Sequence, residues 1–137
     1  MSRKTFLNLP VNDLPKAVEF FTSLGFSFNK DFTDENATCM VISDESYVML
    51  LVKPFFESFA SKPLADVENT TGAIVGLSAD SREEVDELVG KALAAGAHEP
   101  KKDTPQEDFM YGRSFIDLDG HHWEIMWMDP NFVPHPA

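Results

Sequence analysis

A turn and a strand follow one another in the stretch Asp117–Met128, which reads DLDGHHWEIMWM. The dipeptide Asp119-Gly120 is typical of a tight turn between strands, because glycine adopts the positive φ that such turns require. Side chains alternate along the strand after this turn, which puts Trp123, Ile125 and Trp127 on one face and His122, Glu124, Met126 and Met128 on the other. Glu124 is thus a carboxylate on a strand whose faces are otherwise mostly apolar, which indicates a partner or a function for it.

Two amphipathic helices are predicted upstream of this strand. The first begins after Asp13, a favourable N-cap, and ends at Gly25, a favourable C-cap. The second begins at Ser81, which forms a capping box with Glu84, and ends at Gly96. Apolar residues recur every three or four positions along each helix, so each helix must cover a sheet.

Strands surround the two helices in the same order. They are predicted over residues 4–11, 26–28, 37–42 and 47–52 in the first half, and over 72–79, near His98, 109–118 and 121–128 in the second half. The order β-α-β-β-β therefore occurs twice. We predict one α+β domain over residues 1–137, with unit one at 3–53, a crossover at 54–70, unit two at 71–129 and a C-terminal tail at 130–137. Alignment of the hairpin residues Asp44 and Asp119 puts Met49 where Glu124 lies in the second unit.

The composition excludes several classes of protein. Lys and Arg number 11 against 23 Asp and Glu, a formal net charge of -12 that would repel a phosphate backbone, so nucleic acid is not an expected partner. Cys39 is the single cysteine, which excludes a disulfide scaffold and favours the reducing cytoplasm. No stretch reaches the roughly 18–20 apolar residues of a membrane helix, so no membrane association is expected.

The duplicated unit resembles the vicinal oxygen chelate superfamily, which includes glyoxalases, extradiol dioxygenases, fosfomycin resistance enzymes and bleomycin-binding proteins. The residues that carry the resemblance are LPVNDL at 9–14, LSAD at 77–80 and the DLDGHHWE motif at 117–124. FMYGRSF at 109–115 and WEIMWMD at 123–129 are similar to a branch of predicted lactoylglutathione lyases. The resemblance implies that each unit curls into a half-barrel and that the paired half-barrels form a cup-shaped site.

The resemblance also implies where metal ligands would lie. Metal-dependent members take His, Gln or Glu ligands from the first and last strands of each unit. Those positions fall at Phe6, at Met49 or Leu50, near Ile74, and at Glu124, so Glu124 alone matches. One carboxylate is not a site for a divalent metal, which needs several oxygen or nitrogen donors. The sequence therefore assigns no cofactor, and Glu124 with His122 would hold a divalent metal if one is bound.

We expect the cup to bind a small, partly apolar molecule. The predicted ligand-binding residues are Phe6, Asn8, Met49, Tyr111, Arg113, His122 and Glu124. Two interpretations of Glu124 stay open: a catalytic base, or a carboxylate paired with Arg113 on the adjacent strand. His122 is open between a core histidine and a ligand contact.

The alternative function is a metal-dependent lyase of the lactoylglutathione lyase type, or a related isomerase or dioxygenase, that uses Glu124 as ligand or base. Relatives of this fold commonly pair two chains, so a homodimer is expected by analogy. Phe55, Phe56 and Phe59 in the crossover have helical spacing and are expected to pack, or to line the mouth of the cup. Cys39 is expected to be a small buried apolar residue.

Overall fold

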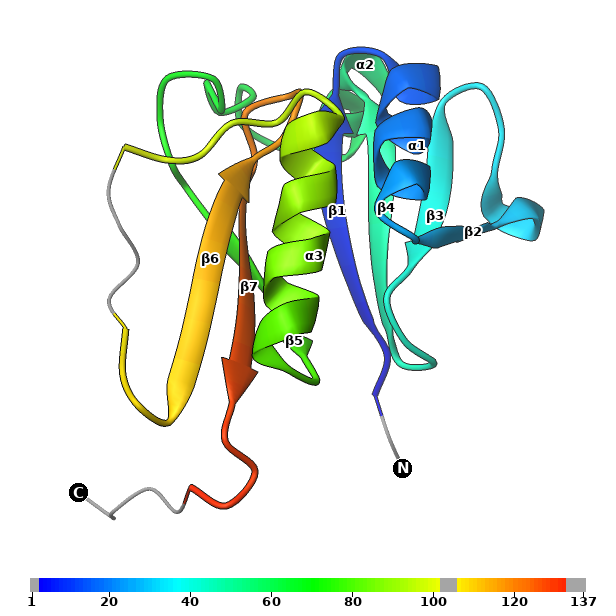
Figure 1. The fold of residues 1–137 in the computed structure, drawn as a ribbon. Coiled ribbons are helices and arrows are strands. Elements are labelled where there is room, and N and C mark those ends of the chain that lie inside the picture. Colours follow the sequence, from blue (N-terminus) through cyan, green and yellow to red (C-terminus); the bar gives the residue numbers. More distant parts are fainter. Residues whose placement is uncertain (1–2, 102–105, 133–137) are drawn as a thin grey trace. The chain divides into compact units, whose positions relative to one another are not determined.

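The computed structural model describes residues 3–101 and 106–132. It has the predicted α+β architecture, with two open sheets (Figure 1). The chain divides into two compact units, Met1–Thr70 and Thr71–Ala137, and each unit is described by itself. The cup between paired half-barrels stays a prediction, and residues 133–137 of the predicted tail lie outside the described residues.

The first unit contains β1 (Thr5–Val11), α1 (Leu14–Ser23), β2 (Ser27–Asn29), the 3-10 turn η1 (Lys30–Phe32), β3 (Ala37–Val41), β4 (Ser46–Val52) and α2 (Lys53–Phe59). Its strand order is β1-β4-β3-β2, with β1 and β4 parallel and the other pairs antiparallel. The first helix starts as predicted, because the Asp13 carboxylate accepts the N–H of Lys16 at 3.1 Å. Gly25 follows the helix with a φ of 103°, a conformation that favours glycine.

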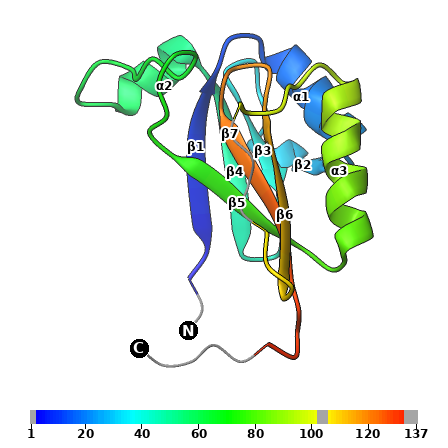
Figure 2. The same ribbon diagram turned by 60° about the vertical axis from the view of Figure 1, so that its left-hand side comes forward.

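The core of the first unit lies between α1 and one face of its sheet (Figure 1). From α1, Leu14, Ala17, Phe20 and Phe21 are buried. From the strands, the buried residues of this face are Leu9, Val11, Met40, Val48 and Leu50. The opposite face of the sheet is left to α2, which lies on the side away from α1 (Figure 2).

The second unit contains β5 (Ile74–Ala79), α3 (Arg82–Ala94), β6 (Met110–Ile116) and β7 (His122–Met128), in the strand order β5-β7-β6. The predicted capping box is confirmed: Ser81 Oγ accepts the N–H of Glu84, and Glu84 Oε2 accepts the N–H of Asp80. The strand predicted near His98 is wrong, because His98 forms only an isolated bridge with Ile116. Pro100, two residues later, has no N–H and cannot extend a ladder.

The core of the second unit packs α3 against the Trp123 face of its sheet. Val85 and Val89 of α3 are fully buried, as is Trp123, whose ring stacks on Phe115 at 6.2 Å between centroids. A buried carboxylate holds the turn before β7 in place. Asp117 Oδ1 accepts the N–H groups of Asp119 and His121 at 2.9 and 3.0 Å, and Asp117 Oδ2 accepts the indole N–H of Trp123 at 2.8 Å.

Candidate functional site

The first sheet has an open face, which is the face away from α1. Parallel pairing puts Phe6 beside Tyr47 and Asn8 beside Met49, so these four side chains share that face. Phe6 is 55% exposed and stacks on Tyr47 with ring centroids 5.2 Å apart. Phe6, Asn8 and Met49 therefore lie on one face of the first sheet, and strand alternation predicted the shared face of Phe6 and Asn8.

A pocket of about 460 Å³ opens on this face, and we call it the α2 pocket. Its lining residues are Asn8 of β1, Leu51 of β4, Phe56 and Phe59 of α2, and Ala60. Leu51 is buried, whereas no residue of α2 is. The walls are apolar apart from the Asn8 amide, an arrangement typical of small-molecule sites in which few polar groups fix orientation.

The second sheet has a corresponding open face, which is the face away from α3. The register puts His122 between Ile74 and Ile116, and Glu124 between Gly76 and Ser114. Glu124 and His122 are both partly exposed. Within residues 3–101 and 106–132, neither side chain has a hydrogen bond or an ion pair, so both are available to a ligand.

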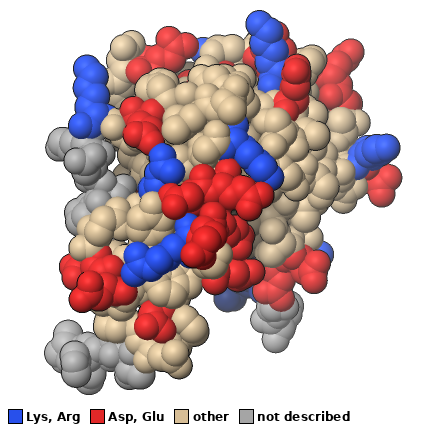
Figure 3. Space-filling model, viewed as in Figure 1, with Lys and Arg blue, Asp and Glu red and all other residues tan. Residues whose placement is uncertain are grey.

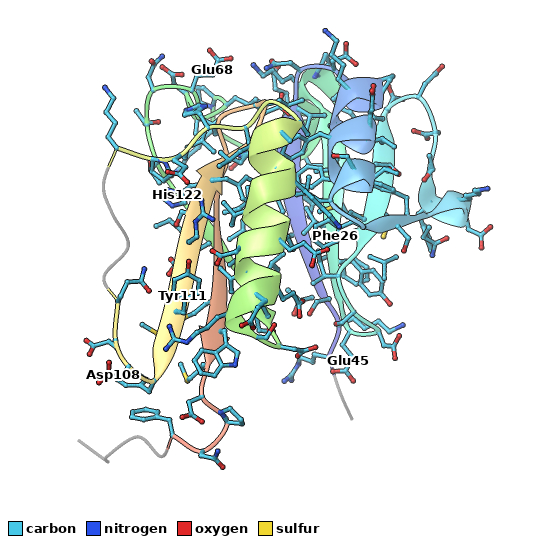
Figure 4. The ribbon with its side chains drawn as sticks, in the orientation of Figure 1. Phe26, Glu45, Glu68, Asp108, Tyr111 and His122 are labelled. Carbon is cyan, nitrogen blue, oxygen red and sulfur yellow. The ribbon has the colours of Figure 1, made fainter. Side chains whose placement is uncertain are left out.

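Tyr111 and Arg113 lie on the other face of β6, which corrects their predicted grouping with Glu124. Arg113 is paired in register with Ile125, not with Glu124, and an antiparallel shift of one residue reverses the face. Tyr111 and His122 also lie at opposite ends of the β6–β7 pair (Figure 4). The proposed ion pair between Arg113 and Glu124 is therefore wrong.

Arg113 pairs instead with carboxylates of the α3 side. Its guanidinium donates to Asp86 at 3.2 Å and to Glu99. Tyr111 donates its hydroxyl proton to the same Asp86 oxygen at 2.5 Å. The hydrogen bond from Tyr111 lowers the pKa of Asp86, and the same bond raises the pKa of Tyr111.

Arg82 completes this cluster on the α3 side. Its guanidinium lies over the Tyr111 ring at 5.5 Å and over the Trp127 ring at 4.9 Å from the centroids. Acidic side chains gather on the surface over α3 (Figure 3), whose sequence supplies Glu83, Glu84, Asp86 and Glu87. The cluster links β6 to α3, because Tyr111 and Arg113 of β6 both bind Asp86 of α3. Tyr111 and Arg113 therefore have a structural role in this unit.

The donor set fits a divalent metal poorly. The predicted ligand positions of the first open face carry Phe6 and Met49, and those of the second carry Ile74 and Glu124. In the part of the chain that the structure describes, no three His, Cys, Asp or Glu side chains gather closely enough to hold a metal ion. Hard cations need several oxygen ligands, which these side chains do not supply.

Three remaining predictions concern Cys39, the aromatic rings of α2 and the helices. Cys39 is buried, as expected, and desolvation raises the pKa of its thiol. Phe55 packs edge to face on Phe59, as helical spacing predicted, and Phe56 and Phe59 also line the α2 pocket. That these rings line the mouth of a cup stays a prediction. None of the helices in residues 3–101 and 106–132 combines the length and apolar character needed to cross a bilayer.

The chain is similar to known proteins in sequence and in structure. Residues 3–43 match the family model described as bleomycin resistance protein-like N-terminal. A hypothetical protein from S. aureus, SA1046, is 29% identical over 93% of this chain and 94% of its own, with a TM-score of 0.76. No curated protein is significantly similar to the chain in sequence.

Two further solved structures share the fold at lower identity. A glyoxalase/bleomycin resistance protein/dioxygenase family enzyme from Burkholderia phytofirmans PsJN is 17% identical over 93% of this chain and 99% of its own, with a TM-score of 0.74. The fosfomycin resistance protein FosX from Listeria monocytogenes, in a mutant form complexed with Mn(II) and dihydroxypropylphosphonic acid, is 18% identical over 91% of this chain and 89% of its own, with a TM-score of 0.67. These likenesses confirm the fold that the sequence motifs predicted.

Proposed function

We propose that this protein, which has the vicinal oxygen chelate fold and is glyoxalase- and bleomycin-resistance-like, binds a small, partly apolar molecule and needs no metal to do so. The observation that carries the proposal is the α2 pocket, whose apolar walls hold a single amide, that of Asn8. Pockets of this size and character are typical of small-molecule sites.

The second unit is proposed to offer a separate polar contact through Glu124 and His122. Both side chains stand on the second open face without a hydrogen bond or ion pair in the described part of the chain. A carboxylate without a protein partner can accept a hydrogen bond from a ligand at little cost, because no existing interaction must break. A ligand held on this face is therefore expected to offer a hydrogen-bond donor.

A thermal-shift screen of a chemically diverse small-molecule library tests this proposal. A ligand at a hundredfold excess over its Kd stabilises the native state by about 2.7 kcal/mol, which raises the melting temperature by roughly 5–10 °C for a domain of this size. Glu124→Gln should change the shift given by compounds that bind to the second open face, whereas Glu45→Gln, on the exposed turn before β4, should not. A library in which no compound raises the melting temperature would refute the proposal.

The second candidate is a metal-dependent lyase or related isomerase or dioxygenase. It is favoured by the position of His122 and Glu124 two residues apart on one strand face, and by the Mn(II) complex of FosX. There Glu124 would serve as ligand or base. Turnover of the hemithioacetal of methylglyoxal and glutathione, abolished by chelator and by Glu124→Gln, would establish this candidate in place of the first.

The chain is further proposed to form a homodimer in the cytoplasm. The edge strand β1 presents Phe6, which is 55% exposed, and exposed edges with apolar side chains favour pairing. Its single, buried cysteine suits a reducing compartment. Sedimentation of the protein at micromolar concentration tests the dimer, and a species of 15.4 kDa alone would exclude it.

A further inference from the structure

The α2 helix presents aromatic rings to the outside of the first unit. Phe55 and Phe59 are four residues apart and meet edge to face, with centroids 5.0 Å apart and planes at 82°. Phe59 is nevertheless 72% exposed, and the helix buries no residue at all. An aromatic side chain that gains so little from its own fold has most of its apolar surface left to offer a ligand.

The chemistry of the α2 pocket is narrow. The buried Leu51 supplies an aliphatic surface, and the rings of Phe56 and Phe59 supply flat aromatic surfaces. None of the five lining residues is ionisable. A charged group seated here would lose its hydration without gaining an opposite charge, which is costly. The formal charge of -12 further disfavours an anion. The part of a ligand that fits this pocket is therefore uncharged and planar.

Among the five described lining residues of the pocket, Asn8 is the one whose side chain can form hydrogen bonds. Its amide nitrogen donates to the Phe6 carbonyl at 3.4 Å, a long bond on the same strand. Within residues 3–101 and 106–132 its amide oxygen accepts no hydrogen bond. An amide oxygen can accept two, so a ligand that donates an O–H or N–H group would complete it.

We propose that the α2 pocket binds an uncharged, planar aromatic ring that carries one hydrogen-bond donor, with the ring against Phe56 and Phe59 and the donor on the Asn8 oxygen. This inference rests on the proposed function and names the class of its ligand. It also assigns a binding role to Phe56 and Phe59, two residues of the crossover.

Three related probes test the inference by calorimetric titration at pH 7. 2-Naphthol is planar and donates, 2-methoxynaphthalene is planar but has no donor, and decahydro-2-naphthol donates but is not planar. We expect 2-naphthol to bind at least about fivefold more tightly than either analogue, as one neutral hydrogen bond or one aromatic contact is worth. Because none of the lining residues in the described part of the chain is ionisable, the affinity should not change between pH 6 and pH 8 or with salt.

Variants locate the binding. Phe59→Ala should weaken 2-naphthol binding about tenfold, whereas Phe32→Ala, which removes another exposed ring of the same unit, should leave it within twofold. Asn8→Ala should weaken 2-naphthol but not 2-methoxynaphthalene, a difference that a merely structural role of Asn8 would not produce. Chemical-shift changes of the Asn8 side-chain amide during an NMR titration give an independent readout. The same spectra show whether the protein is folded.

The outcomes separate this inference from the proposed function. Equal affinity for the three probes, or equal effects of Phe59→Ala and Phe32→Ala, would overturn the inference. If other compounds still raise the melting temperature, the proposed function stands without it. If no compound of any class does so, both fall together.

Discussion

Removing the acceptor at Asp117 should destabilise the second unit strongly. Its Oδ2 accepts the indole N–H of Trp123 at 2.8 Å, and its Oδ1 accepts two backbone N–H groups of the turn. In Asp117→Asn the amide keeps the Oδ1 acceptor but points an N–H group at the indole N–H. The variant loses one hydrogen bond to a charged group, worth about 1.5–3 kcal/mol, and weakens two others. We expect the free energy of unfolding to fall by about 2–3 kcal/mol.

Urea unfolding followed by circular dichroism measures this loss. With a slope of about 2 kcal/mol/M, typical of domains this small, the midpoint should fall by about 1 M or more. Asp34→Asn is the matched control, because Asp34 also accepts two backbone N–H groups, at 2.8 and 3.0 Å, but is exposed. Asparagine serves such turns as well as aspartate does, so this control should stay within about 0.5 kcal/mol of the wild type.

A double-mutant cycle with Trp123→Phe isolates the indole bond. Coupling of about 1 kcal/mol or more between positions 117 and 123 is expected, since the two side chains are directly bonded. Equal destabilisation by Asp117→Asn and Asp34→Asn, or additive effects in the cycle, would refute the view that this carboxylate holds the turn before β7.

Three further predictions concern other side chains. Glu124→Leu should leave the free energy of unfolding within about 1 kcal/mol of the wild type or raise it, because Arg113 is paired with Asp86 and loses no partner. A fall of about 3–5 kcal/mol in urea unfolding would mean that a buried cation depends on Glu124. Tyr111→Phe should raise the pKa of Asp86 in a carbon-13 NMR titration, because the hydrogen bond from Tyr111 lowers it. The stability that this bond contributes is present above the ordinary pKa of 3.8 and is lost as the pH falls through the lowered value. An Asp86 pKa that is the same in the variant and the wild type would contradict the bond. The thiol of Cys39 should react with a disulfide reagent at pH 8 only as fast as the protein opens, since burial raises its pKa, and immediate reaction would contradict its burial.

Local signals made the elements predictable. Asp13, Ser81 and Gly25 each act on the backbone within a few residues, so the helix ends could be predicted from the sequence. Strand alternation likewise placed Phe6 and Asn8 on one face of β1. The exception was the strand near His98, where a single bridge replaced a ladder.

Longer-range facts could not be read in the same way. Alternation showed that Tyr111 and Arg113 share a face, but the register of β6 against β7 decides which face of β7 that is, and a shift of one residue reverses it. The partner of Arg113, Asp86, lies 27 residues away on α3, and no local pattern connects them. Helical spacing in the crossover predicted packing, and Phe55 does pack on Phe59, but spacing does not show how exposed each ring stays. No residue of α2 is buried, and Phe56 and Phe59 line a pocket.

The most direct test of the central claim is the affinity of one screened compound, measured by titration calorimetry before and after exhaustive chelation with elemental analysis of both samples. The account predicts substoichiometric metal in the purified protein and the same Kd, within twofold, after chelation, because the residues at the expected ligand positions are Phe6, Met49, Ile74 and Glu124. One metal ion per chain, whose removal abolishes binding and whose return restores it, would contradict the account.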